Sequence, residues 1–521
     1  METSPEGLVP HAAVSGHNFE VPDNSLDTDD AAREILGILC SARPTYHVFH
    51  YRGDWLLYDL NSGTLLYLSE SAYQILRACE EGRSQDQIAA IIRESATTCD
   101  MGYFLTEIRR YRDLGLFQLE SMPTDEDRSK DVSAHSSVTP RSIQALVQTS
   151  CNLKCSYCYE VKSAFHGTGK SMSFETGRRA VDLLISRAGR RKNLDLNFFG
   201  GEPLLNFPLI KKLVAYASEQ GRPLGKQITF RITTNATLLT EEIIAFLVEH
   251  PFAVMLSVDG PPELADKHRV DHAGRGASAR ALDNAKKLVA AQRRAGRREA
   301  RIRATMTPGN HSALKLAKFF EAHGFRRVMI GAASGTAFDK GEFDLGSAQA
   351  LEMQAEGEHV LDEFLEEIRS RRRRLPRGVR LKDGLDRIHS ALSERKPVGR
   401  AIHCGVGGNM TAVTEHGDIY PCHRYVGQKS FIIGRIDGGV DQSRLRAYFR
   451  DVFRVYDRHC ASCWARIICG GQCPWYLSKP DGEIVDPDSE SCDNIRKGAE
   501  KMLWLYATLR RPDQSVEPRN G

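Results

Sequence analysis

The sequence lacks any long run of uncharged apolar residues, and no stretch approaches the ~20 residues of a membrane-spanning helix. Its first 30 residues contain no Lys or Arg, so we expect no signal peptide. It also lacks a charge surplus, because 71 basic and 67 acidic residues leave a net charge of only +4. That balance gives no general case for binding nucleic acid or an anionic membrane. The 521 residues, 41% of them hydrophobic, predict a cytoplasmic globular protein of about three domains.

Cysteine is missing from residues 159–403, although the chain has 13 cysteines. Cys40, Cys79 and Cys99 are scattered, whereas the others gather within residues 151–158 and 404–492. An odd number of cysteines without an export signal argues against a disulfide framework, and cysteines in a reducing compartment more often bind metals or act in catalysis. We therefore interpret the two clusters as candidate metal-binding regions.

The N-terminal third predicts one small domain. Residues 1–40 are polar and acidic and are expected to be a disordered tail. Residues 45–120 predict three short strands followed by three helices, a winged-helix-like arrangement; the helices are expected at 70–81, 84–94 and 101–115. A polar, Ser-rich segment at 121–140 is expected to be a linker.

Strands and helices then alternate over residues 141–395. The strand candidates are residues 143–149, 194–199, 227–234, 253–258, 301–307 and 327–332. Repeated βα units predict a parallel sheet, because parallel strands need long crossovers. Six units predict a partial (β/α)6 barrel whose ligand site lies at the carboxyl ends of the strands. Gly, Cys and short strands dominate residues 400–495, which indicates a metal-organised domain before a C-terminal tail at 506–521.

Cys151, Cys155 and Cys158 form a C-x3-C-x2-C motif just after the first predicted barrel strand. Three thiolates can hold three irons of a [4Fe–4S] cluster and leave the fourth iron open. A zinc site lacking its fourth ligand and a chance spacing are the alternatives. The three-residue first gap, the aromatic Tyr157 and the position after the strand favour the iron–sulfur interpretation.

This motif resembles that of the radical S-adenosylmethionine (SAM) enzymes. The resemblance implies that the open iron binds SAM and that one-electron cleavage yields a 5′-deoxyadenosyl radical, which abstracts hydrogen from the substrate. Further residues match the SAM-binding positions of that family: Tyr157, Gly200, Gly201, Glu202, Pro203, Thr234, Asn235, Ser257, Asp259, Gly260, Asp266 and Arg269. Arg269 would pair with the SAM carboxylate. Ala265 stands where the family usually has His.

The seven C-terminal cysteines resemble, gap for gap, the SPASM domain of peptide-modifying radical SAM enzymes; two zinc sites are the alternative. The resemblance implies two auxiliary [4Fe–4S] clusters, and hence three clusters in all. The distal cluster would be held by Cys460, Cys463, Cys469 and Cys492, and the proximal one by Cys404, Cys422 and Cys473. The proximal cluster then has one iron that is open or bound by a group such as His403. A substrate thiolate could ligate an open iron.

Residues 46–120 resemble the peptide-recognition element of maturases that act on ribosomally made peptides. There, a leader peptide adds a strand beside the third strand and packs on the last helix. The three domains together resemble thioether-forming maturases of the ranthipeptide (SCIFF) type and of quinohemoprotein amine dehydrogenase, to which GDIYPCHRYVG (417–427) is close. The resemblance implies a Cys-containing precursor peptide or small protein subunit as partner, and an electron donor such as flavodoxin or ferredoxin.

Other functions remain open. Sulfatase maturases carry Asp directly after the cysteine that matches Cys422, whereas this chain has His423, and they lack the N-terminal domain. Carbon–carbon cross-linking, epimerisation and excision of backbone atoms are further possibilities. A non-catalytic zinc or nucleic-acid-binding protein would use basic patches, for which the candidates are Arg369, Arg371–Arg374, Arg377 and Arg380, and Arg293, Arg294, Arg297, Arg298, Arg301 and Arg303. The small net charge instead favours solvated helix faces or contacts with an acidic peptide.

Overall fold

The computed structural model describes residues 28–39, 45–95, 101–113, 115–116, 130, 132–134, 136, 140–158, 170–333, 343, 347–370, 372–376, 379, 381–393 and 404–511. The predicted linker at 121–140, the first 27 residues, Cys40, Cys99 and His403 lie wholly or largely outside these residues. Among the helices that are described, none combines the length and the apolar character needed to cross a bilayer.

The N-terminal unit is a three-stranded antiparallel sheet with helices packed against it. Its strands are β1 (Tyr46–Tyr51), β2 (Asp54–Asp59) and β3 (Leu65–Leu68), paired in that order. Helices α2 (Glu70–Glu80), α3 (Gln85–Ser95) and α4 (Met101–Asp113) follow. These elements lie where the sequence predicts three strands and three helices. A role of this unit in peptide recognition stays a prediction.

An additional helix, α1 (Thr28–Leu39), precedes the sheet. Its Ala32, Ile35 and Leu39 are buried in one core with residues of α3 and α4. The prediction of a disordered tail is therefore wrong for residues 28–39. The apolar side chains recur at helical spacing within an acidic segment, and tertiary packing rather than overall composition orders them.

The central part of the chain is a parallel sheet covered by helices. Six strands pair in sequence order: β4 (Ser142–Gln148), β5 (Asn193–Gly200), β6 (Gln227–Thr234), β7 (Phe252–Ser257), β8 (Arg301–Met306) and β9 (Val328–Ala332). The connecting helices include α7 (Phe174–Ser186), α8 (Phe207–Gly221), α9 (Glu241–Glu249), α11 (Ser278–Arg294) and α12 (Ala313–Ala322). The six predicted parallel strands are confirmed. The strand order of the described residues does not close, as a partial barrel requires.

Local sequence explains why these helices and strands form. Ser173, Thr240 and Ser312 cap α7, α9 and α12 by accepting hydrogen bonds from backbone N–H groups of the first turn. Burial alternates along β8, with Ile302 and Ala304 fully buried in the main core. The intervening residues therefore face the other side of the sheet, because successive strand residues point to opposite faces.

The C-terminal region extends the same sheet. Strand β10 (Met410–Val413) pairs in parallel with β4, and β11 (Asp418–Tyr420), β12 (Gly434–Arg435) and β13 (Gly439–Val440) continue it in antiparallel order. Helices α15 (Gln442–Val455), α16 (Arg466–Cys469) and α17 (Ser489–Thr508) follow. Helix α17 includes residues 506–508, which the sequence analysis placed in a tail, and Tyr506 is buried. That part of the tail prediction is wrong.

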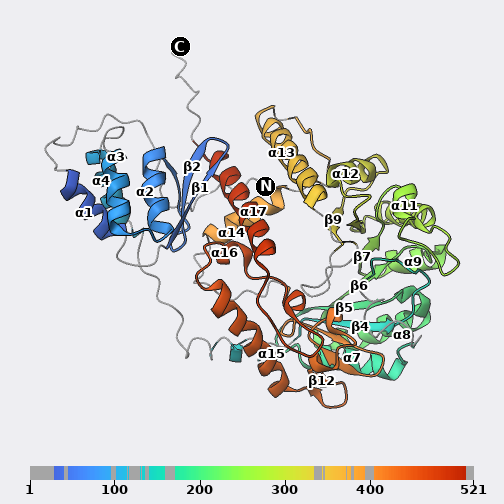
Figure 1. Cartoon of the computed structure of the whole chain (residues 1–521). Helices are drawn as coiled ribbons and strands as arrows, with labels where there is room; N and C mark the ends of the chain where they lie inside the picture. The colour runs from blue at the N-terminus through green and yellow to red at the C-terminus, as the bar shows by residue number, and fades with distance from the viewer. Residues whose placement is uncertain are drawn as a thin grey trace, which may run out of the picture.

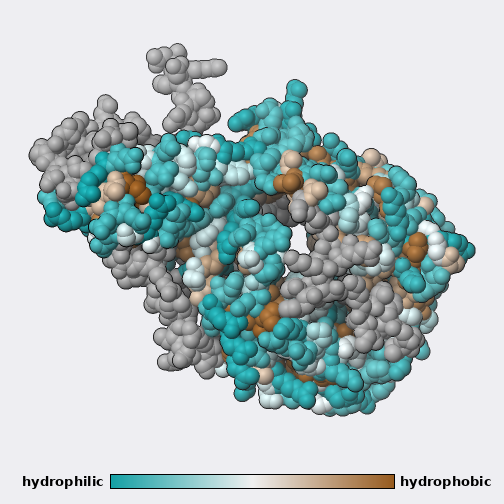
Figure 2. Space-filling model, viewed as in Figure 1, coloured by the Kyte–Doolittle hydropathy of each residue, from teal (hydrophilic) through white to brown (hydrophobic). Residues whose placement is uncertain are grey.

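The two ends of the chain pack against each other. In Figure 1, β1 and β2 lie beside α17, with α13 (Ser347–Ser370) and α14 (Leu381–Ser393) nearby. Phe49 and Leu56 of the N-terminal hairpin share one core with Leu361 of α13 and Leu503 of α17. The N-terminal unit is thus joined to the rest of the molecule by a common core. Figure 2 shows that the visible face is mainly hydrophilic, with an opening near its centre.

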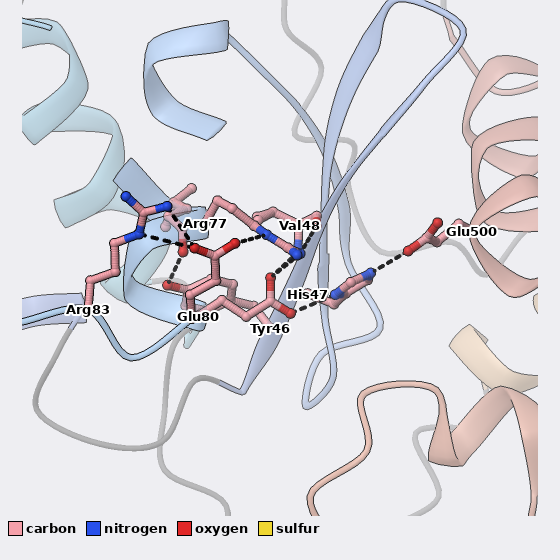
Figure 3. Close-up of polar contacts among 9 residues, drawn as sticks. Tyr46, His47, Val48, Arg77, Glu80, Arg83 and Glu500 are labelled. Atoms are coloured by element: carbon pink, nitrogen blue, oxygen red, sulfur yellow. Dashed lines mark hydrogen bonds and ion pairs between the residues drawn. The ribbon is translucent and has the colours of Figure 1, made fainter. Parts of the chain in front are cut away.

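A buried histidine joins these ends (Figure 3). The His47 ring lies 2.6 Å from Glu80 through Nδ1 and 2.9 Å from Glu500 through Nε2. The same ring stacks on Trp464 at 3.8 Å between centroids. Burial acts to lower the pKa of His47, but the hydrogen bonds that the protonated ring donates to Glu500 and Glu80, with the charges of these carboxylates, outweigh it, so that the pKa is raised. Protonated His47 therefore links α2 to α17.

This link should weaken at alkaline pH. The stabilisation is fully present below the ordinary pKa of 6.5 and is lost as pH rises through the higher folded pKa. Between about pH 6 and about pH 9, the wild type should lose about 1–3 kcal/mol more stability than His47→Gln, measured by denaturant unfolding. His50→Gln, an exposed position on the same strand, is the control and should behave as the wild type. Equal pH dependence in wild type and His47→Gln would contradict the link.

Candidate functional site

The first three clustered cysteines lie on the loop that follows β4. Cys151, Cys155 and Cys158 are partly exposed. Backbone hydrogen bonds fix the loop: the N–H of Lys154 donates to Val270 O (2.7 Å), and the N–H of Ser156 donates to His268 O (3.1 Å). The loop is thereby anchored to the segment after β7. Three thiols are presented together at the carboxyl edge of the sheet.

Gly200 and Gly201 let the end of β5 approach this loop. Gly200 has φ +132°, and a Cβ there would lie 1.9 Å from the carbonyl oxygen of Gln148. At Gly201, a Cβ would lie 2.5 Å from the carbonyl oxygen of Ser150. The N–H of Gly201 donates to Gln148 O at 2.9 Å. Both positions therefore require glycine for close backbone contact.

Glu202 connects three strand ends. Its fully buried carboxylate accepts hydrogen bonds from the Thr234 hydroxyl (2.8 Å), the Asn235 N–H (2.8 Å) and the Leu204 N–H (3.1 Å). Burial raises the pKa of Glu202 to about 7. The Asn235 amide in turn lies 3.7 Å from the Cys151 sulfur. Two residues predicted to bind SAM are thus connected directly to the cysteine loop, and Pro203 begins the short helix η1 (Pro203–Asn206) beside them.

A second buried polar group lies on the other side of the loop. The Tyr157 hydroxyl donates to Asp259, and Arg269 Nη1 lies 2.9 Å from the Tyr157 oxygen and 3.3 Å from Asp259 Oδ2. Burial raises the pKa of Tyr157 well above its usual value. Because the Arg269 guanidinium already binds these two residues, its role toward a SAM carboxylate stays a prediction. Ser257 ends β7 at the same edge.

Asp266 contacts the N-terminus of α11. Its carboxylate accepts hydrogen bonds from the N–H groups of Ala277 (3.0 Å) and Ser278 (2.8 Å) at the start of α11. It therefore caps that helix, which is a common role for Asp.

The seven C-terminal cysteines fall into two spatial groups. In the first group, burial raises the pKa of Cys422 to about 12, and the neighbouring Cys473 and Cys404 act in the same direction. In the second, burial together with three neighbouring cysteines raises the pKa of Cys460 to about 12; these neighbours are Cys463, Cys469 and Cys492. The four cysteines of the second group line one cavity. The structure thus brings together the same sets of three and four that the SPASM resemblance assigns.

These donor sets suit iron–sulfur clusters. Structural zinc needs four ligands around one ion, whereas each thiolate of a [4Fe–4S] cluster binds a different iron. Cysteine-only groups of three and four have the chemistry that such clusters require.

The sequence does not predict the placement of polar side chains on the concave face of the sheet, which is the face opposite the covering helices. Gln144 of β4 accepts a hydrogen bond from the His423 N–H (3.0 Å), and the His423 ring packs on Phe199 at 4.2 Å between centroids. Burial and the charge of Arg424 lower the pKa of His423 to about 3, so this imidazole is neutral. Polar residues at alternating positions of otherwise apolar strands were the available signal.

Residues 146–310 match the family model described as the Radical SAM superfamily. The chain is 25% identical over 337 residues to the cysteine-type anaerobic sulfatase-maturating enzyme of Clostridium perfringens, covering 62% of this chain and 85% of that enzyme. It is 40% identical over 114 residues to the uncharacterised protein MJ0907 of Methanocaldococcus jannaschii, which covers 22% of this chain and 37% of that protein.

Among solved structures, the chain is similar to native anSMEcpe with bound AdoMet and Cp18Cys peptide. The TM-score is 0.54 at 21% sequence identity, and the match covers 71% of this chain and 97% of that chain. At this identity the likeness concerns the fold. The chain thus matches the Radical SAM superfamily over residues 146–310 and is similar over 62% of its length to a sulfatase-maturating enzyme. That superfamily implies a [4Fe–4S] cluster and SAM.

Proposed function

We propose that this protein is a radical SAM maturase that forms thioether cross-links at a cysteine of a ribosomally made peptide. The observation that carries the proposal is the grouping of ten cysteines into three sets. Of the two C-terminal sets, one has four cysteines, and the other has three: Cys404, Cys422 and Cys473. These sets have the chemistry for three [4Fe–4S] clusters. The clusters and SAM would supply the one-electron chemistry.

The residues of the chain would hold and orient the reactants. Cys151, Cys155 and Cys158 would bind the first cluster, and Glu202 with Asn235 would fix the neighbouring strand ends where SAM is expected. Because Glu202 and Asn235 are buried and hydrogen-bonded to each other, their positions are set before a ligand binds.

A peptide partner is supported by the N-terminal sheet. Among the described residues, β3 pairs only with β2, which leaves its outer edge without a neighbouring strand. Leu66 of β3 is buried in the same core as Phe104 and Leu105 of α4. A leader could therefore extend the sheet at β3 and contact α4. The solved structure with a Cp18Cys peptide supports a peptide as substrate, and an electron donor such as flavodoxin or ferredoxin completes the proposal.

Sulfatase maturation is the second candidate, because the match to the Clostridium perfringens enzyme covers 85% of that protein. His423 stands where those enzymes carry Asp, and it is partly buried in contact with Gln144 and Phe199. This difference, together with the N-terminal unit, favours the thioether proposal.

The basic patches support nucleic-acid binding weakly, because several of their arginines form ion pairs with acidic residues of the same chain. Arg374 Nε lies 2.8 Å from Glu363, Arg373 pairs with Glu321, and the Arg293 guanidinium lies 2.7 Å from Glu299. These cations are used in local ion pairs on the surface.

Mass spectrometry tests the proposed reaction. Reduced protein with SAM should convert a short Cys-containing peptide encoded beside its gene into a product two hydrogens lighter, because one C–H and one S–H hydrogen are lost when the C–S bond forms. The joined cysteine should resist alkylation, and reductants should not restore it. The same peptide without its N-terminal leader is the control and should be converted at least about tenfold more slowly.

Each contrary result names another reaction. A loss of two hydrogens with every cysteine still alkylatable would indicate a carbon–carbon link, and an unchanged mass with solvent deuterium incorporated would indicate epimerisation. Formylglycine in place of a single cysteine would identify the sulfatase-type activity.

A further inference from the structure

Arg303 is a cation on the concave face of the sheet. Its neighbours Ile302 and Ala304 are buried on the helix-covered face, so Arg303 lies on the opposite face of β8. Its Nη1 donates to the carbonyl oxygens of Ala304 (2.6 Å) and Gly331 (3.5 Å). No carboxylate of the described residues forms an ion pair with it.

The structure provides space for this guanidinium. A Cβ at residue 331 would lie 2.9 Å from Arg303 Nη2, so Gly331 leaves room that a side chain would fill. Other arginines of the same basic segment are used differently. Arg293 is paired with Glu299, and Arg297 donates to main-chain carbonyls at 3.1 Å. Arg303 therefore differs from Arg293 in having no carboxylate partner among the described residues, and from Arg297 in lying on a strand of the sheet.

The nearest acidic residue is already engaged. Asp259 Oδ1 accepts the Thr305 N–H at 2.9 Å, and Asp259 Oδ2 binds Tyr157 and Arg269. A second positive charge comes from Arg424, which lies over the Trp475 ring at 4.7 Å. Burial acts to lower the pKa of Arg303, the charge of Asp259 acts to raise it, Arg424 acts to lower it, and the net direction is downward. Guanidinium nonetheless stays protonated in proteins, so this partly buried charge favours an incoming anion.

We propose that Arg303, with Arg424 nearby, forms a subsite that binds an aspartate or glutamate side chain of the peptide substrate. The planar guanidinium matches a carboxylate through two parallel hydrogen bonds. The residues expected to bind SAM lie at the carboxyl ends of β5 to β7, whereas Arg303 lies mid-strand on β8, where the charges of both Asp259 and Arg424 act on it. The proposal rests on the proposed function in requiring a peptide substrate.

Binding of small acidic probes tests the subsite in the full-length, cluster-reconstituted protein with saturating SAM. The probes are N-acetyl-L-glutamate N-methylamide and its neutral glutamine counterpart, compared by titration calorimetry. The wild type should bind the acidic probe at least tenfold more tightly than the neutral one. Arg303→Gln should remove this preference without changing SAM affinity or iron content. Arg301→Gln, on the same strand and face, is the charge-matched control and should keep the preference.

The other outcomes are decisive. Equal binding of both probes by the wild type, or an unchanged preference in Arg303→Gln, would overturn the subsite. A loss of SAM affinity in Arg303→Gln with the acidic preference intact would assign the arginine to SAM instead. Formation of 5′-deoxyadenosine, measured in the same samples, reports separately on the proposed function, because loss of the probe preference alone leaves radical SAM chemistry standing.

Discussion

Alanine at Cys151, Cys155 or Cys158 should abolish formation of 5′-deoxyadenosine from SAM while about two thirds of the iron remains bound. Each change removes one of only three thiolates available to the first cluster. The loop itself should keep its shape, because Lys154 and Ser156 hold it through main-chain hydrogen bonds. Chromatography of the dithionite-reduced protein with SAM, together with iron and sulfide analysis, measures both quantities.

Cys79→Ala is the matched control for this experiment. Cys79 is a buried cysteine of α2 that packs in the N-terminal core and belongs to none of the three cysteine sets. The variant should retain full iron content and SAM cleavage. Cleavage at the wild-type rate by the triple variant of the first motif would end the radical SAM interpretation of this loop.

Local patterns in the sequence predict the central sheet well. The strand expected at 227–234 is β6 at the same bounds, and the other five parallel strands begin and end within two residues of their predicted limits. Each is a short apolar run followed by an amphipathic helix, so the information lies within some 30 residues. The cysteine motif is equally local, and Glu202 and Asn235 reach Cys151 because the carboxyl ends of neighbouring parallel strands lie together.

Contacts between distant segments could not be predicted in the same way. The pairing of Thr411 with Ile143 joins the C-terminal region to the barrel sheet, and nothing in either segment identifies its partner. The contact of His47 with Glu500 likewise depends on the final packing of α17. The sequence identifies His423 only as a difference from sulfatase maturases, and Arg303 only as a member of a candidate basic patch. Their placement on the concave face depends on strand register and on docking of the C-terminal region.

Cys473→Ala should stop cross-linking while SAM cleavage continues. Cys473 lies with Cys404 and Cys422, the set of three that would hold the proximal auxiliary cluster and leave one iron for a substrate thiolate. The first motif occupies a separate loop after β4, so its chemistry should not depend on this set. Iron content should fall by about one third, and thioether product should fall by at least about a hundredfold.

Product formation and SAM cleavage must be measured in the same samples. Parallel loss of both would indicate a general defect in folding or cluster assembly, and Cys79→Ala again provides the reference for a cysteine outside the clusters. Continued 5′-deoxyadenosine formation without thioether product would place the requirement for Cys473 after SAM cleavage, at the step where sulfur and carbon are joined. Thioether formation at the wild-type rate in Cys473→Ala would contradict a role of the proximal set in the cross-linking reaction.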